Sequence, residues 1–154
     1  MAGGSALEIS DIPDRVQIPE FECSPELRDL RVLVVDDEAD TRDMLRTVLE
    51  TCGARVTVAG SVAAALEEVK ENVFDVLVSD IGMPEEDGYS LIAKVRANAN
   101  ERGEKVPAAA ALTAYVGEND RVRALEAGFQ MHVPKPISPS GLIAVVTELA
   151  SKAA

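Results

Sequence analysis

The chain has 154 residues, close to the length of one ordinary domain, and 47% of them are hydrophobic, which suffices for a single buried core. This length excludes a large multidomain enzyme. Acidic residues number 27 against 15 Lys and Arg, and the resulting net charge of −12 would repel a nucleic acid. No apolar run approaches the roughly 20 residues that span a bilayer, and the N-terminus has no secretion signal. We therefore expect a cytoplasmic protein that contacts neither nucleic acid nor membrane.

Residues 1–30 differ in composition from the rest of the chain. They contain three of the eight prolines, seven acidic residues and two arginines, without a sustained helical or strand period. This composition is typical of an extended arm or an interdomain linker. We expect the leucines at its end, Leu27 and Leu30, to dock on the domain that follows, which we assign to residues 31–152.

The two cysteines, Cys23 and Cys52, do not have the spacing of metal ligands. Disulfides are rare in a reducing compartment. We therefore expect both side chains to be free thiols without a structural role.

Short apolar runs recur after residue 30 and alternate with segments of helical spacing. The first run, residues 32–35, has four consecutive aliphatic residues, as in a strand buried on both faces. The fourth run is ambiguous, because alanines 108–111 would suit a helix equally well. The predicted strands are 31–35, 55–59, 75–79, 107–112 and 130–133, and the predicted helices are 40–51, 61–71, 89–97, 118–127 and 139–151. Five such units predict an α/β fold with a doubly wound parallel sheet.

Polar residues stand where these strands end. The first strand is followed by Asp36, Asp37 and Glu38, the third by Asp80 and the fourth by Thr113, while the fifth leads into Lys135. In a doubly wound sheet, ligands bind beyond the carboxyl ends of the strands. We therefore expect these carboxylates, one hydroxyl and one ammonium to meet at one edge of the sheet.

Carboxylates that meet in this way need a cation. Two of them about 4 Å apart repel by about 4 kcal/mol at an effective dielectric constant near 20. Oxygen ligands without His or Cys suit Mg²⁺ or Mn²⁺, and Mg²⁺ commonly keeps water and a phosphate oxygen in its coordination sphere. A carboxylate at such a site can act as a nucleophile toward phosphorus, while Lys135 and Thr113 neutralise and orient the phosphoryl oxygens.

A simpler interpretation of the acidic residues is a solvated loop or a helix N-cap, since Asp favours helix starts. Taken alone, Asp36 and Asp37 favour that interpretation. Their combination with Asp80, Thr113 and Lys135 at successive strand ends favours a phosphoryl-binding site instead.

In these residues the chain resembles the receiver domains of two-component response regulators, across nearly all of residues 31–151. The resemblance implies a flavodoxin-like (β/α)5 fold with strand order 2-1-3-4-5. The matching segments are 32–38 (VLVVDDE), 79–84 (SDIGMP), 87–89 (DGY), 112–114 (LTA), 127–129 (AGF) and 133–136 (VPKP).

The resemblance implies that Asp80 accepts a phosphoryl group from a phosphohistidine on a histidine kinase or a histidine phosphotransfer domain. Asp37 and Asp80 would bind Mg²⁺ directly, and Asp36 mostly through water. The main-chain carbonyl of Gly82 would supply a further ligand. Lys135, whose bond to the following proline is often cis in this family, would pair with Asp80 or its phosphoryl group.

The resemblance also implies a switch. Thr113 would donate its hydroxyl to a phosphoryl oxygen and draw its loop inward. The switch residue three places before the lysine, commonly Tyr or Phe, is His132 here. Imidazoles titrate near neutral pH, so this switch could respond to pH, or His132 could be a surface side chain that closes the last strand. Gly82 and Tyr115, two residues beyond Asp80 and Thr113, would modulate the lifetime of the acyl phosphate, unless Tyr115 is simply a loop aromatic.

The output face would be formed by the fourth helix, fifth strand and fifth helix, and it would bind a downstream target or a second copy of the chain. No output domain is expected after the last helix, which leaves a single-domain regulator, a phosphorelay intermediate or the terminal receiver of a hybrid histidine kinase. The arm and the motifs favour the hybrid kinase modestly.

Three rival functions are weaker. A Mg²⁺-dependent aspartyl phosphatase needs a second Asp as general acid two residues after the first, where this chain has Gly82. A flavodoxin-type carrier needs a phosphate loop after the first strand, where the acids would repel a phosphate. A receiver-like module that binds partners without phosphorylation would not need the complete set of acids.

Overall fold

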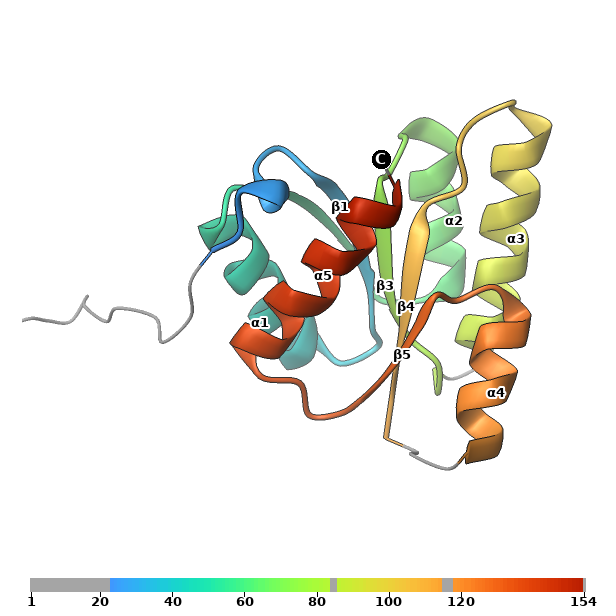
Figure 1. The fold of residues 1–154 in the computed structure, drawn as a ribbon. Helices are drawn as coiled ribbons and strands as arrows, with labels where there is room; N and C mark the ends of the chain where they lie inside the picture. Colours follow the sequence, from blue (N-terminus) through green and yellow to red (C-terminus); the bar gives the residue numbers. More distant parts are fainter. Residues whose placement is uncertain (1–22, 84–85, 115–117, 154) are drawn as a thin grey trace, which may run out of the picture.

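A computed structural model describes residues 23–83, 86–114 and 118–153, which form a five-stranded parallel sheet between two layers of helices. The strand order is β2-β1-β3-β4-β5, so the predicted fold class and strand order are confirmed. Figure 1 shows the sheet edge-on between its helices. The strands are β1 (Arg31–Val35), β2 (Arg55–Ala59), β3 (Val76–Asp80), β4 (Ala108–Thr113) and β5 (Met131–Pro134).

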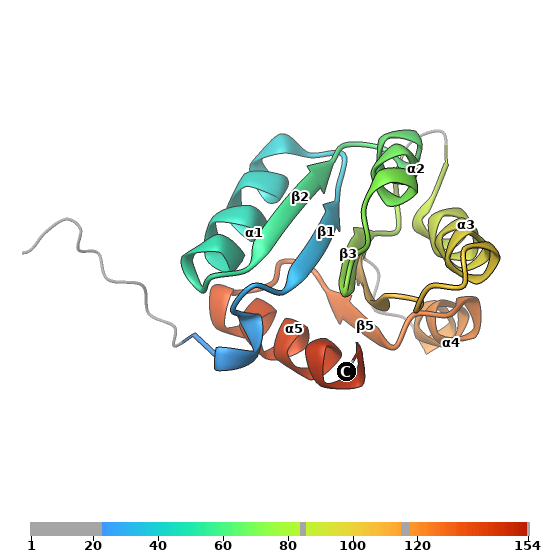
Figure 2. The same cartoon turned by 90° about the horizontal axis from the view of Figure 1, so that it is seen from above.

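The helices divide unequally between the two faces of the sheet. Figure 2 shows α1 and α5 on one face and α2, α3 and α4 on the other, as right-handed crossovers require in a doubly wound sheet. The bounds are α1 (Ala39–Thr51), α2 (Val62–Glu71), α3 (Gly88–Glu101), α4 (Glu118–Ala127) and α5 (Pro139–Ala153). In the part of the chain that the structure describes, every helix is too short or too polar to cross a bilayer.

Side chains alternate along each strand between two separate cores. On β1, Val32 and Val34 pack with α1 and α5, whereas Leu33 and Val35 pack with α2 and α3. All six residues of β4 are buried, which resolves the ambiguity of its alanines in favour of a strand. Pairing with β3 on one side and β5 on the other satisfies the backbone of β4, and this tertiary context overrides the helical propensity of alanine.

Helix α3 ends four residues later than predicted. The prediction ended it at Ala97, before an alternation of asparagine and alanine, but Ala99 is buried and the helix continues to Glu101. The side-chain amide of Asn98 donates to the main-chain carbonyl of Val69 at 3.3 Å, so this polar residue joins the end of α3 to α2. The other helix bounds lie within two residues of the prediction.

The segment before β1 is anchored to the domain. Pro25–Leu27 forms a 3-10 helix, and the side chain of Leu27 is fully buried in the core beside α1 and α5, while Leu30 packs against that core. The amide of Asp29 donates to the carbonyl of Gly53 at 2.8 Å. The leucines therefore dock as expected, whereas the division of the chain at residue 30 stays a prediction.

The expectation of free thiols is wrong in this structure, where Cys23 and Cys52 form a disulfide with their Cα atoms 5.1 Å apart. Cys52 caps the C-terminal end of α1, and Leu27 docks close to that end of the helix. The docked segment thereby brings Cys23 to Cys52. A separation of 29 residues in the chain gives no sign of this contact.

We predict that the disulfide stabilises the domain mainly by restricting the unfolded chain. The variant Cys23→Ser should lower the free energy of unfolding by about 3 kcal/mol, because the unfolded chain regains the freedom that a closed loop of about 30 residues removes. Urea unfolding with and without reductant measures this difference. Reductant should leave the variant unchanged, and equal midpoints for the wild-type chain in both conditions would contradict the prediction.

Candidate functional site

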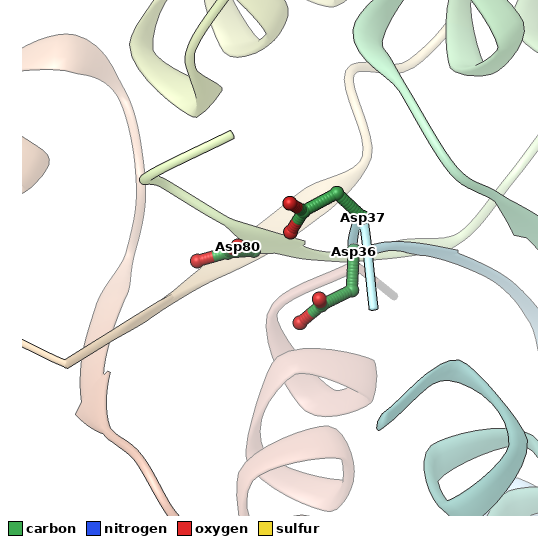
Figure 3. A group of neighbouring side chains, drawn as sticks. All are labelled: Asp36, Asp37 and Asp80. Atoms are coloured by element: carbon green, nitrogen blue, oxygen red, sulfur yellow. The ribbon is translucent and has the colours of Figure 1, made fainter. Parts of the chain in front are cut away.

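Three carboxylates meet at the carboxyl edge of the sheet. Asp36 and Asp37 follow β1, Asp80 ends β3, and one oxygen from each lies within 4.8 Å of the others. Figure 3 shows the three side chains gathered where the two neighbouring strands end. An open cavity of about 310 Å³ lies beside them, and its lining residues are Asp37, Glu38, Asp80, Gly82, Thr113, Ala114 and Lys135.

Asp36 is the most deeply buried of the three. Its side chain is inaccessible to solvent, and its Oδ1 accepts the amide of Glu38 at 2.9 Å. Lys135 Nζ lies 2.8 Å from Oδ2, an ion pair at hydrogen-bonding distance. A carboxylate oxygen has two lone pairs, so Oδ2 retains one for a metal ion or for water.

Lys135 reaches the acids from the loop after β5. Its Nζ lies 3.6 Å from Oδ1 of Asp80 as well as beside Asp36. Its amide donates to the carbonyl of Thr113 at 2.8 Å, and the Lys135–Pro136 bond is cis. Burial alone would lower the pKa of Lys135, but the carboxylates of Asp36 and Asp80 outweigh burial and raise it. The side chain therefore stays a full positive charge between two acids.

Asp80 is held at the cavity by few hydrogen bonds. It is 6% exposed, and its Oδ1 accepts the amide of Gly82 at 3.2 Å. Burial, followed by the negative charge of Asp36, raises the pKa of the Asp80 carboxyl, although Lys135 and the Gly82 amide act in the opposite direction. One lysine thus leaves the carboxylate of Asp80 incompletely neutralised.

The donor set fits a hard divalent cation. All candidate ligands are oxygens, the three carboxylates converge, and the ion pair with Lys135 leaves a lone pair on the buried Oδ2 of Asp36. Mg²⁺ and Mn²⁺ prefer such oxygen ligands. A cation between the three carboxylates would offset the repulsion among them that the single charge of Lys135 does not neutralise.

Two other predicted residues, Thr113 and His132, lie on the neighbouring strands β4 and β5. Thr113 is buried at the end of β4 and lines the cavity. His132 is half-buried on β5 opposite Ala111, so it lies on the same face of the sheet as Thr113, and its Nε2 is buried without a hydrogen bond to a described residue. Tyr115 lies outside the described residues.

Two residues near the acids were not assigned to the site from the sequence. Arg42, in the first turn of α1, donates from Nη1 to the main-chain carbonyl of Asp36 at 2.8 Å. Gly88, one residue before the predicted start of its helix, begins α3 against β3, and a Cβ there would lie 2.7 Å from the carbonyl oxygen of Asp80. Nothing in the spacing of either residue signals its contact, because both contacts depend on the packing of a helix against the sheet.

We predict that Asp80→Asn raises the free energy of unfolding without divalent cations, because it removes one of the clustered charges. Because the pKa of Asp80 is raised in the folded chain, the ionised side chain destabilises the fold, and it does so only at a pH where the residue is ionised. The gain should therefore be present at neutral pH and disappear as the pH falls through the ordinary range of an aspartate, where the residue is neutral in both states.

Urea unfolding with EDTA at several pH values measures this effect, and the exposed Asp43→Asn serves as the control. Saturating Mg²⁺ should reduce or reverse the advantage of the Asp80 variant, because the ion stabilises the wild-type fold. A destabilised Asp80→Asn at neutral pH without cations would show that the carboxylates do not repel.

Comparison with known proteins agrees with this geometry. Residues 32–147 match the sequence-family model of the response regulator receiver domain. An uncharacterized 14.6 kDa protein in the sodA1 3′ region of Leptolyngbya boryana is 47% identical over 122 residues, which cover 79% of this chain and 91% of that protein. The transcriptional regulatory protein PrrA of Mycobacterium tuberculosis is 40% identical over 119 residues, covering 77% of this chain and 49% of PrrA.

A further relative, the sensor protein GacS of Pseudomonas syringae pv. syringae, is 34% identical over 116 residues, covering 75% of this chain but 13% of GacS. This chain thus spans half or less of the two larger relatives.

Solved structures give the same result. A receiver domain protein from Methanospirillum hungatei has a TM-score of 0.71 at 25% identity, covering 80% of this chain and 95% of that one. The receiver domain of a Francisella response regulator has a TM-score of 0.70 at 29% identity, and the match covers 80% of this chain and 98% of that one. The chain belongs to the response regulator receiver domain family and is a module of two-component signal transduction.

Proposed function

We propose that Asp80 is the phosphoacceptor of this receiver and that the donor is a phosphohistidine of a histidine kinase or a histidine phosphotransfer domain. The observation that carries the proposal is the position of Asp80 at an open cavity, beside two further carboxylates and 3.6 Å from Lys135. A carboxylate oxygen attacks phosphorus, an O–P bond forms, and the N–P bond breaks with its electron pair on the imidazole nitrogen.

In this proposal the cation is Mg²⁺ or Mn²⁺. Asp37 and Asp80 bind it directly, Asp36 acts mostly through water, and the carbonyl of Gly82 completes the protein ligands. When bound, the ion neutralises the charge of the phosphoryl oxygens and of the carboxylates. Lys135 and the Gly82 amide favour the ionised form of Asp80 against burial and the charge of Asp36, and the hydrogen bond from the Gly82 amide holds the carboxylate at the cavity.

Lys135 and Thr113 act on the phosphoryl group. The ammonium of Lys135 lies 2.8 Å from Asp36 and 3.6 Å from Asp80. It can therefore pair with a phosphoryl oxygen on Asp80. Thr113 lines the same cavity from β4 and can donate its hydroxyl to a phosphoryl oxygen. The loop after β4 would then move toward the site.

The movement of Thr113 would pass to His132 and from there to the face of α4, β5 and α5. His132 lies opposite Ala111, two residues before Thr113 on β4, and its buried Nε2 forms no hydrogen bond to a described residue that would hold the ring in place. Val122 and Leu125 on α4 are exposed apolar side chains that a downstream target or a second copy of the chain could cover. A pH-sensitive switch at His132 stays a second, untested interpretation.

The context of the domain and its cytoplasmic location also stay proposals. The relatives include a sensor protein and a transcriptional regulatory protein, of which this chain matches 13% and 49%. Both a stand-alone regulator and the receiver of a hybrid histidine kinase are compatible with these matches. The rival aspartyl phosphatase is disfavoured because Gly82 has no side chain to act as the general acid.

We predict that incubation with Mg²⁺ and a small phosphodonor such as acetyl phosphate adds one phosphate to the chain. Intact mass spectrometry measures the adduct. Asp80→Asn should abolish it, and EDTA should abolish it in the wild-type chain. The matched control is Asp75→Asn, because Asp75 immediately precedes the N-terminal end of β3, whereas Asp80 is at its C-terminal end. This variant should be phosphorylated normally. An undiminished adduct on Asp80→Asn would reject the assignment.

We predict that the residue at position 82 controls the lifetime of the acyl phosphate. A Cβ at Gly82 would meet no atom within 4 Å, so the fold should tolerate Gly82→Leu. The apolar side chain would hinder water beside Asp80 and slow dephosphorylation several-fold, and Gly82→Ala should have a smaller effect. Tyr115→Ala should also change the rate of dephosphorylation in the same assay. Equal phosphate lifetimes in all these variants would contradict the proposal.

A further inference from the structure

Arg42 closes the loop that carries two of the three carboxylates. Its amide donates to the carbonyl of Glu38 at 3.1 Å, as the first turn of α1 requires. Its guanidinium donates from Nη1 to the carbonyl of Asp36 at 2.8 Å. The two bonds tie the segment between β1 and α1 to the helix that follows it.

The guanidinium rests against Gly60, the residue after β2. A Cβ at Gly60 would lie 3.0 Å from Nη1 and 3.5 Å from Cζ of Arg42. Gly60 does not have a positive φ, so its backbone does not itself call for glycine. The space that a side chain would take is instead filled by the guanidinium, and the loop after β2 thereby fixes where the guanidinium can lie.

The bond to the Asp36 carbonyl restrains the peptide group between Asp36 and Asp37. The amide of Asp36 already donates to Ala59 at 3.1 Å, and its carboxylate is buried beside Lys135. Asp37 is exposed and lies between two restrained peptide groups: the Asp36 carbonyl before it accepts from Arg42, and the Glu38 amide after it donates to Oδ1 of Asp36. Because a peptide group is planar, fixing the carbonyl also fixes the direction in which the Cα of Asp37 leaves it.

We propose that Arg42 is a positioning residue for the cation site: it orients the Asp36–Asp37 peptide so that the Asp37 carboxylate faces Asp80, and Gly60 provides the space for it. The inference rests on the proposed metal site and adds a residue that does not touch the ion. Hydrogen-bond partners that hold metal ligands commonly change metal affinity by about 10- to 100-fold when they are removed.

The charge of Arg42 and its positioning role would change the Mg²⁺ affinity in opposite directions, so the inference can be tested. A guanidinium near a cation site repels the cation, so the loss of its charge alone would tighten Mg²⁺ binding. The loss of positioning would weaken it. The direction of the change in affinity therefore separates the two roles.

The experiment is calorimetric titration of the full chain with Mg²⁺, at a pH where all carboxylates are ionised. Arg42→Ala should weaken Mg²⁺ binding by about tenfold, and Arg42→Lys, which keeps one donor but loses the planar fork, should be intermediate. Gly60→Ala keeps the charge but displaces the guanidinium, and it should weaken binding several-fold. In the Arg42→Ala background the same Gly60 substitution should have little further effect.

Arg46→Ala is the matched control, because Arg46 lies on the same helix and pairs with Glu50 on the exposed surface. It should leave the Mg²⁺ affinity unchanged, and urea unfolding of each variant reports any general loss of stability. Unchanged or tighter binding by Arg42→Ala would overturn the positioning role, and so would full additivity of the Gly60 and Arg42 substitutions. A wild-type chain that binds no Mg²⁺ would overturn the proposed metal site itself, and this inference with it.

Discussion

Repulsion between acids at one edge of the sheet is the constraint on which the rest of this structure depends. A parallel sheet directs the carboxyl ends of β1 and β3 to the same edge. Asp36 and Asp37 follow β1 and Asp80 ends β3, so one oxygen from each of the three carboxylates lies within 4.8 Å of the others. A single ammonium, that of Lys135, lies among them. The fold thus holds an excess of negative charge in a partly buried position, and this excess is what makes the site receptive to a divalent cation and, through it, to a phosphoryl group.

The residues around the acids hold this arrangement in place rather than relieve it. The Gly82 amide, the Glu38 amide and the Arg42 guanidinium all donate to atoms of Asp80 or Asp36, so the backbone and the carboxylates are positioned before any ion arrives. Gly88 lets α3 begin against the carbonyl of Asp80. Such advance positioning lowers the reorganisation that phosphoryl transfer would otherwise require. The small residues of β4 complete the arrangement, because they allow helices to pack closely on both faces of the strand that carries Thr113.

The sequence predicts the elements and the acidic edge because both depend on local pattern. Aliphatic runs such as residues 32–35 identify buried strands, and the positions of Asp36, Asp80, Thr113 and Lys135 at strand ends place them on one edge once a parallel sheet is assumed. What the sequence does not predict depends on contacts between distant segments. The disulfide of Cys23 follows from the docking of Leu27, the extension of α3 follows from the bond between Asn98 and α2, and the role of Arg42 follows from a glycine on another loop. None of these contacts has a signature in spacing or composition.

The central claim is that the three aspartates form one cation site in which Asp80 is a ligand. Crystals of the chain grown with Mn²⁺ test it directly, because anomalous scattering locates the ion without reference to activity. The account predicts a single strong peak at coordinating distance from the carboxylates of Asp37 and Asp80 and from the carbonyl of Gly82. A peak elsewhere, or no peak while the carboxylates turn away from one another, would contradict it.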